Sequence, residues 1–242
     1  MSGNDEQPTA ANRDAANWAQ NVARLKVSQV PDGAVNLNVD GRQLTSPIQG
    51  FGQMWQKTYV VRLPGERIAP AELIATWRRQ FGDFWPSGNH FYGPLTGIEP
   101  GDVALLNLRM PGGSKLSTGV MVLYADEESF TLMTPQGHMF AGWITFSAAR
   151  QGDETVVQSQ VLMRASDPIF ELALTMGGHR QEDLFWSQTL GNVAAHFGHP
   201  EAVVDTTVVC VDKRRQWSRW RNVWQSSAIR STIYMVTPRR SR

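Results

Sequence analysis

Three side chains of this sequence have the chemistry to move a proton or bind a polar group, and none belongs to a short motif. His138 follows the turn at 135–137, where an imidazole serves as a general base or bonds the turn backbone. His179 follows a pair of glycines, and Arg164 stands three residues before an Asp-Pro pair. We favour the bond to the turn for His138 and keep His179 as the second candidate for a site.

Arg164 and Glu171 flank Asp167-Pro168, at a predicted corner between a strand and a helix. The two charges could form a buried pair or an ordinary salt bridge across this corner. We favour a structural pairing, because an unpaired buried charge is costly. Asp167 is expected to cap the helix, since its carboxylate can accept hydrogen bonds from the first backbone N–H groups.

The residues around the other reactive side chains argue against a metal site or a nucleophile there. His196 and His199 have the spacing of metal ligands on a helix, but Gly198 lies between them and no cysteine or acidic cluster is near. We therefore expect helix-end capping there and no metal. Cys210 lies in an apolar run, where a thiol acts as a small hydrophobic group. The sequence has no Gly-x-Ser-x-Gly motif and no complete phosphate-binding loop, so no cofactor is expected.

The composition is that of a globular protein. Of 242 residues, 41% are hydrophobic and 19% charged, and the formal net charge is +1. The single cysteine cannot form an internal disulfide, and no apolar run reaches the ~18 residues of a membrane span. The first residues lack the pattern of a signal peptide. We therefore expect a cytoplasmic protein.

Hydrophobic spacing and turn residues predict the elements that position these side chains. Apolar alternation at 51–63 predicts a strand, and the stripe at 69–82 predicts a helix. A second short helical turn or a loop follows at 84–86. Short polar turns separate the next strands, which therefore form an antiparallel meander. These strands are expected at 102–110, 115–124, 129–134, 138–148 and 154–165, with a further one near 91–97.

A long final helix is predicted at 168–197, with a kink at Gly177-Gly178. One antiparallel sheet bracketed by an early helical pair and this helix is an α+β arrangement, in which the sheet curls around the helix. The chain then divides into a disordered N-terminus at 1–15, an extended arm with a short helix at 16–50, a central domain at 51–198 and a helical tail at 199–242.

This order of elements resembles the helix-grip fold of the START-like, or SRPBCC, superfamily, which includes polyketide cyclases and proteins similar to the birch-pollen allergen. The sequence segments that carry the resemblance are GFGQMWQKTY at 50–59, FWP at 84–86, TPQGHMFAGW at 134–143 and RASDP at 164–168. It looks like a bacterial branch with no assigned reaction. The resemblance implies a curved sheet of about six to seven strands around the long helix, with an apolar cavity between them.

The implied cavity would hold a lipid, a polyketide or another hydrophobic small molecule. Unbranched methionines and wide aromatic faces suit an adaptable apolar pocket. The same residues could simply fill a core, but we predict a pocket. The residues expected to line it are Trp55, Tyr59, Phe81, Trp85, Met121, Leu123, Met139, Trp143, Met163, Phe170, Leu174 and Met176.

The tail differs from the body in charge. Residues 199–242 hold nine basic and three acidic residues, a net of +6, whereas residues 1–198 carry a net of −5. Trp217, Trp220 and Trp224 stand at i, i+3 and i+7, which predicts a basic amphipathic helix. It could dock on the chain itself or on a second copy, lie on an anionic membrane, or contact nucleic acid, in that order of preference. The contact residues are expected to be Arg214, Arg215, Trp217, Arg219, Trp220, Arg221 and Trp224.

The sequence therefore predicts binding of a hydrophobic small molecule, with delivery to or from the inner face of a membrane as a role for the tail. The alternative is a cyclase- or aromatase-type enzyme in which His138, Arg164 or His179 handles protons. Cyclases of the superfamily use scattered polar residues, so a missing motif does not exclude one. A third interpretation is a regulatory interaction module with a vestigial pocket. The first two differ in whether these polar groups converge inside the cavity.

Overall fold

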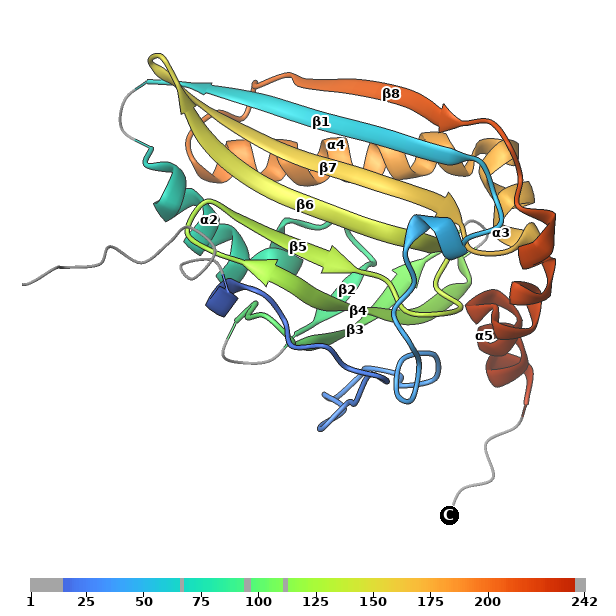
Figure 1. Ribbon diagram of the computed structural model, residues 1–242. Helices are drawn as coiled ribbons and strands as arrows, with labels where there is room; N and C mark the ends of the chain where they lie inside the picture. Colours follow the sequence, from blue (N-terminus) through green and yellow to red (C-terminus); the bar gives the residue numbers. More distant parts are fainter. Residues whose placement is uncertain (1–14, 66–67, 94–96, 111–112, 238–242) are drawn as a thin grey trace, which may run out of the picture.

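The computed structural model describes residues 15–65, 68–93, 97–110 and 113–237, and it shows one curved antiparallel sheet with a long helix across it (Figure 1). The eight strands are ordered β2-β3-β4-β5-β6-β7-β1-β8. This α+β arrangement confirms the predicted fold class. The strands are β1 (Met54–Pro64), β2 (His90–Tyr92), β3 (Val103–Arg109), β4 (Lys115–Ala125), β5 (Ser129–Met133), β6 (Phe140–Gln151), β7 (Glu154–Ala165) and β8 (Val204–Asp212).

The predicted long helix is present and is interrupted at the glycine pair. It consists of α3 (Pro168–Ala173), the π-helical turn η5 (Leu174–Gly178) and α4 (His179–His196). Asp167 caps its start, because Asp167 Oδ1 accepts hydrogen bonds from the backbone N–H groups of Ile169 and Phe170 at 2.8 and 3.0 Å. The two helices expected after the first strand are α2 (Pro70–Arg79) and the 3-10 turn η3 (Phe81–Phe84).

The inner face of the sheet is apolar and is covered by α2, η3 and α4. Tyr59 and Val61 of β1 are buried there with Trp77 of α2, and α4 lies against β1, β7 and β8. A dense aromatic cluster fills the part of this layer nearest α2 and η3, where the Phe81 ring contacts four others at centroid distances of 4.9–5.5 Å. Its members are Trp77, Phe81, Trp85, Phe91, Phe130, Phe146, Phe185 and Trp186.

The N-terminal arm crosses the outer face of the sheet. A bridge from Trp18 to Tyr124 and another from Leu44 to Pro135 attach it, and Leu25 and Val39 are buried against β3 and β4. Two 3-10 turns occur in this segment, η1 (Ala15–Asn17) and η2 (Pro47–Gln49). The expected disordered segment lies outside the described residues except for Ala15, which begins η1.

The start of the tail is a strand and not the helix that we expected. Residues 204–212 form β8, which pairs antiparallel with β1 at the edge of the sheet. The run Val208-Val209-Cys210-Val211 explains this difference, because β-branched residues favour an extended strand. Helical structure follows as predicted in η6 (Trp217–Gln225), a 3-10 segment, and in α5 (Ser227–Val236). Within the described part of the chain, no helix is long and apolar enough to cross a bilayer.

Candidate functional site

A buried lysine forms the centre of a polar cluster between β1 and α4. The side chain of Lys57 has no exposed surface, and its Nζ donates hydrogen bonds to Asp183 Oδ1 at 2.7 Å and to the His179 carbonyl at 3.3 Å. Glu182 Oε2 lies 2.9 Å from the same nitrogen, and Tyr59 donates its hydroxyl to Asp183 Oδ1 at 2.8 Å. We call Lys57, Tyr59, His179, Glu182 and Asp183 the Lys57 cluster.

Strand alternation and helix spacing explain how these groups meet. Lys57 and Tyr59 are two residues apart on β1, so both point to the inner face of the sheet. His179, Glu182 and Asp183 stand at i, i+3 and i+4 in the first turn of α4, and they therefore share one side of that helix. One element supplies the cation and the phenol, and the other supplies both carboxylates.

The helix interruption just before His179 sets the position of this first turn. Met176 and Gly177 leave helical geometry, and the φ of Gly177 is 111°, a region that residues with a Cβ rarely occupy. Single turns of π-helix inside longer helices occur frequently at functional sites. Here the turn separates α3 from the helix that carries both acids.

The cluster holds more negative than positive groups, and burial shifts their proton affinities. Burial raises the pKa of Glu182 to about 7, although the Lys57 ammonium acts in the opposite direction. Burial also raises the pKa of Tyr59 far above its ordinary value, with the charges of Glu182 and Asp183 adding to the effect. The pKa of His179 is lowered, first by burial and then by Lys57. Glu182 can therefore exchange a proton near neutral pH.

Several buried polar atoms around Lys57 have no hydrogen-bond partner among the described residues. They are Trp55 Nε1, Ser159 Oγ, His179 Nδ1 and Glu182 Oε1. The Trp55 and His179 rings meet edge to face at 4.8 Å, and Ser159 pairs with Tyr59 across β1 and β7. An unpartnered buried polar atom costs about 1–3 kcal/mol, so such a group within one region indicates a place that receives a polar molecule.

Apolar side chains beside the cluster keep part of their surface accessible. The register places Lys57, Val161 and Ile144 in one row across β1, β7 and β6, so Ile144 lies about 10 Å from Lys57 along the inner face. The half-buried side chains that pack against the inner core include Trp55, Leu108, Phe140, Ile144, Phe185 and Trp186. The inner face thus combines an apolar surface with one polar end.

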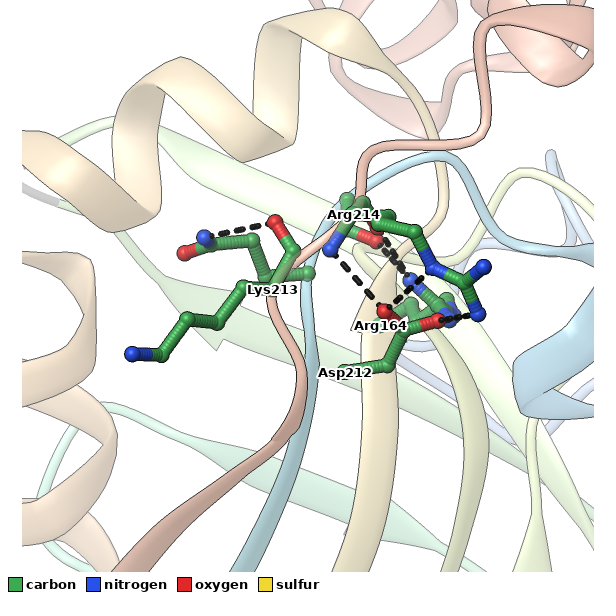
Figure 2. A network of polar contacts seen from close by, with 6 residues as sticks. Arg164, Asp212, Lys213 and Arg214 are labelled. Atoms are coloured by element: carbon green, nitrogen blue, oxygen red, sulfur yellow. Dashed lines mark hydrogen bonds and ion pairs between the residues drawn. The ribbon is translucent and has the colours of Figure 1, made fainter.

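Arg164 belongs to a different network, at the other side of the sheet (Figure 2). Its guanidinium donates to the carbonyls of Gly52 and Arg214 at 2.5 and 2.8 Å and to Asp212 Oδ2 at 2.6 Å. Hydrogen bonds from Arg214 and Arg164 hold the pKa of Asp212 well below its usual range. This network fastens the end of β8 to β7 and to the chain before β1.

The predicted partnership of Arg164 with Glu171 is wrong. Glu171 Oε1 instead accepts a hydrogen bond from Arg215 Nε at 2.7 Å. The physical reason is that β8 brings the basic tail to this corner and supplies a closer partner to each charge. The expectation of a structural role for Arg164, in place of a site role, agrees with these contacts.

The His138 side chain bonds backbone groups, as we favoured from the sequence, but at Phe140, the first residue of β6, and not at the turn 135–137. Its Nδ1 lies 3.0 Å from the Phe140 nitrogen and 3.2 Å from the Phe140 carbonyl oxygen, so it accepts from that N–H in one tautomer and donates to that carbonyl in the other. Burial lowers the pKa of His138 to about 4, so the ring is neutral at physiological pH. His179 is therefore the one of the three predicted polar candidates that joins the Lys57 cluster.

The structure divides the twelve expected lining residues among several places. Trp55, Tyr59, Phe81, Trp85 and Met163 face the inner core. Met139, Phe170 and Leu174 pack in a second apolar cluster beside α3, and Met176 is 78% exposed at the helix interruption.

The other three residues lie on the outer face, and their expected position was wrong. Met121 and Leu123 pack with the arm, and strand alternation puts Trp143 opposite the inward Ile144. The error has a simple cause, because every second residue of a strand points away and both faces of this sheet are apolar. Met121 and Leu123 line an open hollow of about 560 Å³ between the arm and β4–β5.

Sequence analysis missed Lys57, Glu182 and Asp183. A signal was present, because Lys57 stands between Trp55 and Tyr59 on the face of the strand that is otherwise apolar. A lysine in such a position must find a buried acid or point to water. The acidic pair at 182–183 stands at the start of the helix segment that packs on this strand.

No metal centre accompanies the cluster. Among the residues that the structure describes, no group of three histidine, cysteine or acidic side chains has the arrangement of a metal site. His196 and His199, which we expected at the helix end and not as metal ligands, flank the end of α4, where the His196 ring contacts Phe84 at a centroid distance of 5.4 Å. The side chains of the cluster can hydrogen bond and exchange protons by themselves.

The strand order and the long helix decide the fold. The chain has the helix-grip fold of START-like proteins. No protein-family model matches the chain, and no curated protein matches its sequence.

Similar solved structures include the di-domain ARO/CYC StfQ from the steffimycin biosynthetic pathway, with 10% identity and a TM-score of 0.46 over 59% of this chain and 50% of that one. This chain therefore matches half the length of StfQ. Ara h 8.0201 has 9% identity and a TM-score of 0.40 over 58% and 97%. A START superfamily protein from Mycobacterium smegmatis has 22% identity and a TM-score of 0.36 over 55% and 94%. At these identities the likeness concerns the fold alone.

Proposed function

We propose that the protein binds an apolar small molecule on the inner face of the sheet, with one polar group of that molecule at the Lys57 cluster. The observation that carries the proposal is the group of unpartnered buried atoms around Lys57 on an otherwise apolar face. A ligand that satisfied these atoms would recover the free energy that their burial costs. Half-exposed apolar side chains such as Ile144 and Phe140 would contact its hydrocarbon part.

The unpartnered atoms define the polar group that fits. Trp55 Nε1 can only donate a hydrogen bond, and the deprotonated Glu182 can only accept one. A hydroxyl group can serve both, and a carbonyl group can serve Trp55 and a protonated Glu182. We therefore expect a hydroxylated or keto-bearing apolar molecule, and not a fatty acid, because a further carboxylate would be repelled by the two acids already present.

A second candidate function is proton transfer of the cyclase or aromatase type, and one observation favours it. The pKa of Glu182 is about 7, so this carboxyl group is divided between its two protonation states near neutral pH. In such a reaction Glu182 would take a proton from carbon next to a ligand carbonyl, and Trp55 Nε1 would donate a hydrogen bond to the oxygen that gains charge.

Native mass spectrometry of the full chain, followed by solvent extraction of what it carries, tests the binding proposal. We expect a released apolar molecule with the wild type and at least tenfold lower occupancy with Trp55→Phe, which keeps the ring and removes the donor. Trp18→Phe on the arm is the matched control and should leave occupancy unchanged. An empty wild-type protein, or equal occupancy in both variants, would contradict the proposal.

Glu182→Gln separates the two candidate functions. Glutamine keeps the shape of the side chain and its ability to hydrogen bond, but it cannot take a proton. A binding protein should retain its ligand in this variant, whereas an enzyme should bind the molecule and no longer convert it. The mass of the molecule released from each protein distinguishes these outcomes.

A further inference from the structure

The 3-10 segment η6 carries three exposed tryptophans and packs against α3. Trp217 and Trp224 are 70% and 75% exposed, and Trp220 is also exposed. Leu172 of α3 and Met176 of the adjoining turn η5 also expose apolar side chains. We call η6 and these neighbours the tail face.

The chain holds η6 through polar contacts, and these leave the rings outside. The Gln216 N–H donates to the Phe51 carbonyl at 2.7 Å, and Asn222 Nδ2 donates to the carbonyls of Gln49 and Ser166 at 2.9 and 2.8 Å. Among the described residues, only Trp217 of the three tryptophans has a ring contact to the body, with Phe51 at 5.2 Å. Of the preferred expectation, docking of the tryptophan stripe on the chain itself or on a second copy, the first half fits Trp217 alone.

Part of the positive charge of the tail face has no acidic partner among the residues that the structure describes. Glu171 is paired with Arg215, and Asp212 with Arg164 and Arg214. Arg219 and Arg221 are exposed and have no carboxylate partner in the described part of the chain, and Arg221 lies 5.6 Å above the Trp220 ring. Arg221 therefore places an unpaired guanidinium group beside a large apolar ring, and Arg219 lies next to Asn222 at the edge of a polar hollow between η6 and the body.

We propose that the tail face binds the surface of an anionic lipid bilayer. Tryptophan rings fit the boundary between headgroups and hydrocarbon, and arginines attract anionic headgroups at the same depth. The polar contacts of η6 hold the backbone that carries these side chains before contact, which lowers the ordering cost of binding. This inference does not depend on a ligand at the Lys57 cluster.

Vesicle flotation of the full-length protein tests the proposal. We expect binding to phosphatidylcholine vesicles that contain about 30% phosphatidylglycerol, weaker binding without the anionic lipid, and a decrease as salt is added. Arg219→Gln/Arg221→Gln should reduce the partition coefficient about thirtyfold. Trp220→Ala/Trp224→Ala should reduce it by about tenfold or more. Removal of the whole tail is unsuitable, because β8 would leave with it.

Matched variants away from the tail face provide the controls. Arg109→Gln/Lys115→Gln removes two exposed charges from the β3–β4 pair, and Trp18→Ala removes an exposed ring from the arm. Both should bind vesicles as the wild type does. The proposal is overturned if the controls lose as much binding as the tail variants, or if the wild type ignores anionic vesicles. It is also overturned if the tail variants change only the binding of a single-stranded oligonucleotide or the formation of a dimer.

Discussion

Lys57 and Arg164 are both buried cations, but their surroundings differ. Arg164 donates to two backbone carbonyls and to Asp212, whose pKa is held low by two arginines. Lys57 faces two carboxylates, and one of them, Glu182, has a pKa raised to about 7. In the Arg164 network only Arg164 Nε lacks a hydrogen-bond partner among the described residues, whereas the Lys57 cluster holds two carboxylates for one cation and several unpartnered polar atoms.

The difference separates a structural network from a binding site. Charges at the end of β8 are neutralised by short contacts that tie distant segments together (Figure 2). The charged groups between β1 and α4 remain partly without hydrogen-bond partners. Stability of the fold alone gives no reason to retain them, because replacing a buried ion pair by well-packed apolar residues often leaves the free energy of unfolding unchanged or raises it. Function is therefore the better explanation for the Lys57 cluster.

The largest expected effect concerns the Arg164 network. Arg164→Met leaves two carbonyls without their donor and removes one of the two arginines that bind Asp212, so we expect the free energy of unfolding to fall by about 4 kcal/mol in chemical denaturation. Arg214→Met, an exposed member of the same network, should change it little. If the two variants were equally stable, Arg164 would not be the residue that ties these segments together.

A pH titration of stability should distinguish Glu182 from ordinary carboxylates. Its pKa rises from 4.5 to about 7 on folding, so the folded state holds a proton that the unfolded state has released. Stability due to this group is fully present below pH 4.5 and is lost as the pH rises through 7, by up to about 3 kcal/mol. Glu182→Gln should remove this decrease, which denaturation of both proteins between pH 4.5 and 8 measures.

His138 supplies a comparison of opposite sign. Its pKa falls from 6.5 to about 4 on folding, so its stabilising effect is present above pH 6.5 and is lost as the pH falls towards 4. The wild type should therefore lose stability relative to His138→Asn as the pH falls, whereas it should lose stability relative to Glu182→Gln as the pH rises. Parallel changes in the two variants would contradict the assignment of both groups.

Removal of the lysine should cost less than removal of Arg164. In Lys57→Met, Glu182 can take up a proton and Asp183 is 31% exposed, so neither acid stays as an isolated buried charge. We expect a loss of about 2 kcal/mol at pH 8 and a smaller one at pH 5. Lys57→Met/Glu182→Leu, which removes both buried charges, should regain much of the loss. A loss independent of pH would argue against the coupling between these two groups.

The smallest expected effect concerns the helix interruption beside the cluster. Gly177→Ala should destabilise by about 1 kcal/mol because its φ of 111° suits glycine, although a Cβ there would meet no atom within 4 Å. Gly191→Ala in the regular part of α4, also without a close neighbour, should stabilise by about 0.5–1 kcal/mol. Thermal denaturation of both variants checks the opposite signs.

The sequence predicted the fold well because its main signals are local. The strand at 51–63, the polar turns of the meander and the glycine pair at 177–178 each determine structure through their own residues. β8 was missed because the helix predicted from the basic, tryptophan-rich residues that follow it was extended over the whole tail at 199–242. Its apolar β-branched run was the better guide.

The Lys57 cluster was harder to predict because its members are more than 120 residues apart in the chain. Only the packing of α4 on β1 shows that Lys57 contacts Glu182 and Asp183. Which apolar residues face inward was also open, since the arm makes both faces of the sheet apolar. Met121 and Leu123 therefore looked equivalent to Trp55 and Met163 until the strand register was known.

A crystal structure of the protein as purified is the most direct test of a ligand at the Lys57 cluster. We predict electron density from a non-protein molecule within hydrogen-bond distance of Glu182 Oε1 and Trp55 Nε1, extending along the inner face past Ile144. Ordered water alone at these two atoms, with the inner face closed by the chain's own side chains, would contradict the account.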